Sequence, residues 1–135
     1  MAETIIVREC RHGQVRVQFG NIIRVDGDIM IIPANNRLAG REGLDERMQL
    51  AAGDELRARC TEIAVERRKE GKQPCGVGEA VTTPGYNLPA ENLVHVVGPD
   101  CRRPNQDNFR RELLVNSYNA MFDEISKIEP RETVV

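Results

Sequence analysis

The chain has 135 residues, of which 40% are hydrophobic and 30% charged, and its net charge is −2. This composition is typical of one globular domain over 1–135, and the near-neutral charge gives no electrostatic footprint for nucleic acid. No run approaches 18 apolar residues, and the N-terminus is not a signal peptide, so we expect a cytoplasmic protein with no membrane partner.

The first half of the chain predicts three strands and a helix. Residues 4–7 and 15–19 are strand-like, and "RHGQ" supplies turn residues between them. The segment 15–19 alternates apolar and polar residues, which predicts one buried and one wet face. Residues 29–32 ("IMII") do not alternate, which predicts a strand buried on both faces. A helical pattern then runs from Asp54 to about Glu70.

The second half predicts two further strands and a longer helix. "EAVTT" and "NLVHVV" lie on either side of the turn-rich "PGYNLPAE", and "TVV" at the end opens one more strand. Strands that alternate with helices imply an α/β sheet. The segment 105–128 is the clearest helix, because apolar residues that we expect in the core recur at helical spacing: Phe109, Leu113, Leu114, Tyr118, Met121, Phe122 and Ile125.

The most polar segment of the chain directly follows the strand that we expect to be most buried. It reads "PANNRLAGREGLD" and ends at Asp45, where a helix starts. A glycine-bearing loop between a strand and a helix presents backbone N–H groups and a helix N-terminus, which suit a phosphate. A plain connection explains the same pattern equally well. Neither a Walker lysine nor a G-x-G-x-x-G run is present.

The four cysteines show no metal-binding spacing. Cys10, Cys60, Cys75 and Cys101 form no C-x-x-C pair, so we interpret them as reduced thiols and expect no disulfide, no metal and no cofactor. His95 shares one face of its strand with apolar neighbours and is interpreted as structural.

Two long segments together resemble one known family. "NNRLAGREGLDERMQLAAGDEL" follows, without insertion, the Gly-rich signature of the macro domain, an α/β module that binds ADP-ribose. "CGVGEAVTTPGYNLPAENLVHVVGP" is similar to the second signature of that family, and the resemblance covers roughly residues 15–125. It implies a three-layer α/β/α fold with a mixed sheet.

The resemblance implies roles for individual residues. "VQFGNIIRV" matches the adenine-binding element, so Asn21 would face the adenine amino group and the backbone of Ile22 a ring nitrogen. Asn35 matches the asparagine that holds the distal ribose, and Asp45 matches the acid that orients water in the hydrolytic branch. These two are the expected catalytic residues.

The rest of the expected binding segment is the Gly-rich loop, with Gly40 and Gly43 as its outer glycines and Ala34, Arg41 and Leu44 beside them. Arg41 and Glu42 replace two family glycines. Side chains do not freely take φ > 0, so we expect the loop to fit the diphosphate less closely.

The family continues beyond the last predicted strand with a second Gly-rich loop, a strand and a helix, so the resemblance implies a macro-like fold without that C-terminal portion. An uncovered strand edge recruits partners, which predicts a homodimer. We expect binding of ADP-ribose or an ADP-ribosylated protein, with weak hydrolysis at the distal ribose (de-ADP-ribosylation or O-acetyl-ADP-ribose deacetylation) at most. A binding module without catalysis, and a scaffold without nucleotide affinity, remain the alternatives.

Overall fold

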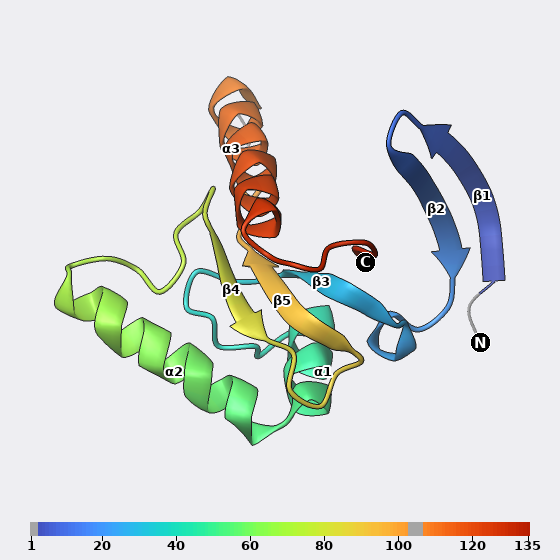
Figure 1. Ribbon diagram of the computed structural model, residues 1–135. Coiled ribbons are helices and arrows are strands. Elements are labelled where there is room, and N and C mark those ends of the chain that lie inside the picture. Colours follow the sequence, from blue (N-terminus) through green and yellow to red (C-terminus); the bar gives the residue numbers. More distant parts are fainter. Residues whose placement is uncertain (1–2, 103–106) are drawn as a thin grey trace.

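A computed structural model describes residues 3–102 and 107–135. A three-stranded sheet lies between helices, and a two-stranded hairpin stands apart from it (Figure 1). The elements follow in the order β1 (Glu3–Cys10), β2 (Gly13–Phe19), the 3-10 helix η1 (Ile22–Arg24), β3 (Gly27–Pro33), α1 (Gly43–Ala52), α2 (Asp54–Lys69), β4 (Ala80–Pro84), β5 (Ala90–Val96) and α3 (Asp107–Ser126).

The central sheet is mixed, as the resemblance implies. β5 lies in the middle, with β3 parallel to it on one side and β4 antiparallel on the other. The segment 133–135 runs parallel to β3 on its other edge, where the Val135 amide donates to the Ile29 carbonyl at 2.8 Å. The "TVV" segment therefore lies in the position of a further strand.

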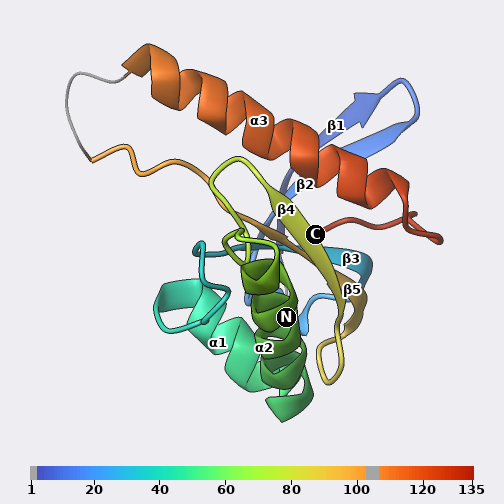
Figure 2. The same ribbon diagram turned by 90° about the vertical axis from the view of Figure 1, so that its left-hand side faces the viewer.

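Two apolar clusters hold the three layers together. Met30 and Ile32 point to the face covered by α1 and α2, whereas Ile29 points to the face covered by α3. Figure 2 shows α3 on one side of the sheet and the other two helices on the opposite side. Each such buried side chain contributes about 1.5–3 kcal/mol. The prediction that 29–32 is buried on both faces is confirmed, because these three side chains are fully buried.

The helix predicted from Asp54 is α2, and its inward face carries Leu56, Cys60 and Ile63. None of the helices in the described residues is long and apolar enough to cross a membrane.

The prediction that 15–19 has one buried face is wrong. β2 alternates as expected, but Val15, Val17 and Phe19 are 58%, 49% and 73% exposed. Among the described residues the two strands of the hairpin pair only with each other, and no helix or further strand covers their apolar face. Alternation shows which face can be buried, and another element must be present to bury it.

The apolar stripe predicted for the core on α3 is only partly correct. Residues 105 and 106 of the predicted helix lie outside the described residues. Met121 is buried, but Phe109, Leu114, Tyr118 and Phe122 are 45–60% exposed. The helix instead places Ser117 against the sheet, where its Oγ donates to the Val97 carbonyl at 3.0 Å. A small side chain there allows close approach of the helix to β5.

Candidate functional site

The loop after β3 lies where ligands commonly bind in α/β sheets. β3 and β5 are parallel, so their carboxyl ends meet at one edge of the sheet. The Ala34 amide continues the pairing by donating to the Val96 carbonyl at 2.9 Å. The loop after β5 starts at the same edge, because it follows the carboxyl end of that strand. In this loop the hydrogen bond and charge of Asp100 raise the pKa of Arg102, and the charge of Glu42 adds to this to a smaller degree.

Asn35 organises the loop through its own side chain. Its Oδ1 accepts from the Arg37 amide at 3.0 Å and from the Ala39 amide at 3.2 Å. Leu38 follows with a positive φ and is buried, which anchors the loop to the core. The Asn35 Nδ2 has no partner among the described residues and can still donate to a ligand.

The two outer glycines adopt the conformation that glycine favours. Gly40 has φ +56° and Gly43 has φ +59°. Arg41 and Glu42 between them stay out of the left-handed region, and Glu42 is extended with φ −140°. The two replacements therefore cause no backbone strain, although their side chains still occupy space.

Helix α1 begins directly after the loop and leaves N–H donors available. Glu42 is its N-cap residue but makes no side-chain cap hydrogen bond. The first N–H groups of a helix have no partner inside the helix. Those of Gly43 and Leu44 are therefore suited to an anion at this end of α1.

Asp45 points inward rather than onto an open surface. Only 6% of the residue is exposed, and both carboxylate oxygens lack a hydrogen-bond partner within the described residues. It shares the inner face of α1 with Met48, Gln49 and Ala52. Burial raises the pKa of Asp45 to about 6, and the nearby Gln49 amide opposes this to a smaller degree.

The surroundings of Asp45 include two side chains that sequence reasoning missed. Gln49 donates from Nε2 to the Leu38 carbonyl at 3.3 Å and packs beneath Gly40. The thiol of Cys60 on α2 has its pKa raised to about 11, first by burial and then by the charge of Asp45. The helical spacing of Asp45 and Gln49, four residues apart, is the signal that could have placed both on one face.

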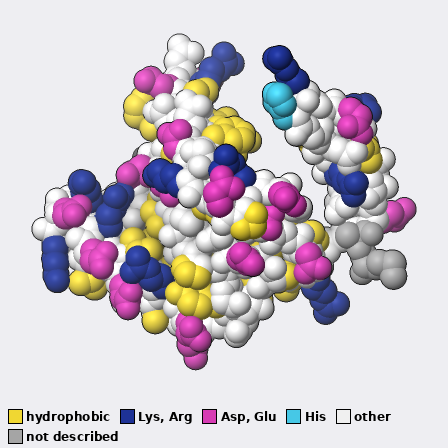
Figure 3. All heavy atoms as spheres, viewed as in Figure 1, with side chains coloured by type: hydrophobic (Ala, Val, Ile, Leu, Met, Phe, Trp, Pro, Cys, Tyr) yellow, Lys and Arg dark blue, Asp and Glu magenta, His cyan; other side chains and the backbone are white. Residues whose placement is uncertain are grey.

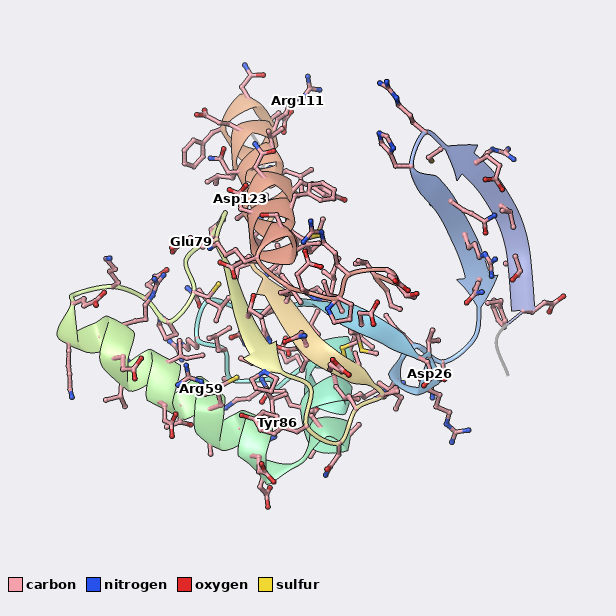
Figure 4. All side chains as sticks on the ribbon, viewed as in Figure 1. Asp26, Arg59, Glu79, Tyr86, Arg111 and Asp123 are labelled. Carbon is pink, nitrogen blue, oxygen red and sulfur yellow. The ribbon has the colours of Figure 1, made fainter. Side chains whose placement is uncertain are left out.

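Asn21 and Ile22 lie at the other end of β3. The Asn21 Oδ1 caps η1 by accepting from the Ile23 amide at 3.3 Å. Ile22 lines a hollow of about 740 Å³ between β2 and the segment 132–135. Asp26, labelled in Figure 4, marks this end of the sheet. A ligand that touches Asn21 and Ile22 as well as the loop 34–45 has to run along the length of β3.

The remaining candidates behave as packed side chains. His95 is fully buried, its Nε2 lies 2.9 Å from the Thr83 Oγ1, and burial lowers its pKa to about 4. Tyr86, labelled in Figure 4, is half-buried against the larger core cluster. All four cysteines are free thiols, and within the described ranges no three His, Cys, Asp or Glu residues gather as a metal site.

Comparison with known proteins identifies one family. Residues 31–132 match the model of the macro domain. An O-acetyl-ADP-ribose deacetylase of Escherichia fergusonii is 35% identical over 106 residues, which cover 77% of this chain and 57% of that protein. A protein-ADP-ribose hydrolase of Staphylococcus aureus is 35% identical over 104 residues, 73% of this chain and 38% of that protein.

The fold agrees with a solved structure of the same family. The Oceanobacillus iheyensis macrodomain with ADP superimposes with a TM-score of 0.81 at 24% identity, over 94% of this chain and 64% of that one. The chain spans little more than half the length of the first of these relatives, and less of the second.

Proposed function

The chain belongs to the macro domain family, and from this premise we propose that it binds ADP-ribose or ADP-ribosyl groups through the loop 34–45. The observation that carries the proposal is the conformation of that loop. Gly40 and Gly43 both take positive φ at the carboxyl end of a parallel strand, directly before the free N–H groups of α1. A diphosphate needs such backbone donors. The names of the two enzymes that resemble the chain support the same ligand.

Titration of the protein with free ADP-ribose in a calorimeter tests this proposal. We expect saturable binding with one ligand per chain, and competition by ADP. The absence of binding up to millimolar ADP-ribose would favour the alternative, a macro-fold scaffold without nucleotide affinity. The homodimer stays a prediction, which the solution mass at high protein concentration checks.

Asn21→Asp is expected to tighten ADP-ribose binding. A carboxylate accepts a stronger hydrogen bond from the adenine amino group than an amide oxygen does, by about 1 kcal/mol. Aspartate also caps a helix as well as asparagine, so the bond to the Ile23 amide is retained. Calorimetry measures the change, and Asn21→Ala, which removes both interactions, is the control. Equal affinity of the aspartate variant and the parent would exclude position 21 from the adenine site.

Hydrolysis is expected to be absent or very slow. General acid–base catalysis needs the group within hydrogen-bond reach of the reacting water, and Asp45 is buried beneath the loop. The measurement is the release of ADP-ribose from a protein that is mono-ADP-ribosylated on acidic side chains. Fast turnover by the parent that disappears in Asp45→Ala, with both proteins folded by circular dichroism, would contradict this expectation.

A further inference from the structure

Two hollows on the surface share a set of positive side chains. One, of about 370 Å³, lies between the loop after β3 and residues 71–74, and the other, of about 290 Å³, lies between that loop and α2. Arg37 and Arg68 line both, so the two hollows adjoin. We call the combined surface the basic groove, and its cations are Arg37, Arg41, Arg57, Arg68 and Lys72.

Most of the charge of the basic groove has no ion-pair partner among the described residues. No acidic residue lines either hollow. Of its cations, only Lys72 has an ion pair among the described residues, with Glu70 at 3.4 Å and with both side chains about three-fifths exposed. The chain as a whole has a net charge of −2. Figure 3 shows acidic and basic side chains interleaved over the region of α2.

The groove has the length of a short extended peptide. Arg57 and Arg68 lie eleven residues apart on the same side of α2, with Thr61 and Ala64 between them. At 1.5 Å per helical residue this separation is about 16 Å. A strand rises about 3.3 Å per residue, so the groove accommodates about five residues of an extended chain.

The lining favours a peptide over a nucleic acid. Val65, which is 45% exposed, adds apolar surface to the groove, and no aromatic side chain lines it. Proteins that hold single-stranded nucleic acid generally stack bases on aromatic rings. Arginine side chains pair well with carboxylates, in a bidentate geometry. An acidic peptide with small apolar side chains matches both features of the groove.

We propose that the basic groove holds an acidic stretch of the polypeptide that carries the ADP-ribosyl group. This inference rests on the proposed function, because Arg37 and Arg41 belong to the groove and also to the loop assigned to ADP-ribose. A carrier chain that leaves the loop at Arg41 can continue along α2. The groove then distinguishes acidic carriers from others through salt-sensitive ion pairs.

Charge reversal on α2 tests the groove. The probe is a fluorescein-labelled peptide of alternating Glu and Ala residues, about ten residues long, followed by fluorescence anisotropy at low and at physiological salt. We expect the double variant Arg57→Glu with Arg68→Glu to weaken binding about tenfold or more. Free ADP-ribose should bind this variant as it binds the parent, since neither side chain lies in the loop 34–45.

The matched control is Lys69→Glu with Arg111→Glu. It makes the same change in net charge at two exposed positions that do not line the groove, one at the C-terminal end of α2 and one on α3 (Arg111 is labelled in Figure 4). We expect it to weaken binding of the acidic peptide only slightly. An equal loss in both double variants would overturn the inference, because general charge would then explain the binding.

Three further outcomes decide the matter. The same peptide with one ADP-ribosylated glutamate should bind more tightly than either free ADP-ribose or the unmodified peptide, since one chain then engages both sites. No gain, no measurable binding of the acidic peptide, or tighter binding of a single-stranded RNA of equal length would each overturn the inference. If the parent protein does not bind free ADP-ribose, the proposed function is contradicted instead. Failure of the proposed function and failure of the groove inference are therefore distinguishable.

Discussion

Asp45→Asn is expected to increase the free energy of unfolding by about 3 kcal/mol at pH 7 and by less than about 1 kcal/mol at pH 4. Burial raises the pKa of Asp45 from 3.8 to about 6 in the folded protein. Between these values the unfolded chain releases the proton and the folded protein keeps it. Stability therefore falls as the pH rises through this window, and the full cost is present above about pH 6. Asparagine carries no charge at any pH and avoids the cost.

The position of Asp45 in the first turn of α1 stabilises its carboxylate, and this opposes the cost of burial but is smaller. A carboxylate in the first turn of a helix gains about 0.3–1 kcal/mol from the helix dipole, which is smaller than the cost of burial. An asparagine Nδ2 could also donate to the Gln49 Oε1, which is buried without a partner among the described residues. Both considerations leave the sign of the prediction unchanged.

Denaturant unfolding at several pH values measures this difference. Glu46→Gln is the matched control, because it removes the same charge from the exposed neighbouring position in the same turn. Its stability difference from the parent should change with pH by no more than the roughly 0.3–1 kcal/mol that a first-turn carboxylate gains from the helix dipole. An Asp45→Asn protein that follows the pH profile of the parent, or that is less stable at pH 7, would show that the carboxylate has favourable partners in solution.

The sequence allowed the sheet to be predicted because its strands carry strong local signals. Residues 29–32 are apolar without alternation, which is what a strand between two helical layers requires. The loop was placed correctly for a similar reason, since two glycines and two asparagines mark a segment that leaves the strand and must turn. Local patterns identify an element and its own faces.

The same patterns could not show what covers each element. The alternation of β2 indicated an apolar face, but Phe19 on that face is 73% exposed. The helix periodicity of α3 indicated a stripe, and the structure turns Phe122 away from the sheet and Ser117 toward it. The face of α3 that packs against the sheet depends on how closely the helix approaches β5, and therefore on the size of the side chains at that contact. That information lies in the tertiary arrangement.

The contacts and burial of the loop side chains could not be predicted from the sequence either. Sequence reasoning assigned Asn35 to the ligand, and the structure shows that its side-chain oxygen also holds the loop together. It assigned Asp45 to water at the ribose, and the structure buries its carboxylate. A residue of the right type at the right spacing is compatible with either role, and only its hydrogen-bond partners and exposure distinguish them.

Gly40→Ala is expected to destabilise the protein by about 3 kcal/mol, compared with about 1 kcal/mol for Gly43→Ala. Both glycines have positive φ, so both substitutions strain the backbone to a similar degree. A Cβ at position 43 meets nothing within 4 Å, whereas a Cβ at position 40 would lie 2.3 Å from the Gln49 Cδ. Gly43→Ala therefore measures the strain alone, and the difference between the variants measures the overlap with Gln49.

A double-mutant cycle shows whether Gln49 is the obstacle. The Gln49 side chain is 2% exposed and donates to the Leu38 carbonyl, so it cannot move aside without losing that bond. Gln49→Ala removes the overlapping atoms, and Gly40→Ala made in that background should cost only about as much as Gly43→Ala. Thermal or denaturant unfolding of the four proteins gives the coupling energy. Additive effects would mean that the loop relaxes around the new methyl group, in which case Gly40 is required by its backbone angle and not by the side chain beneath it.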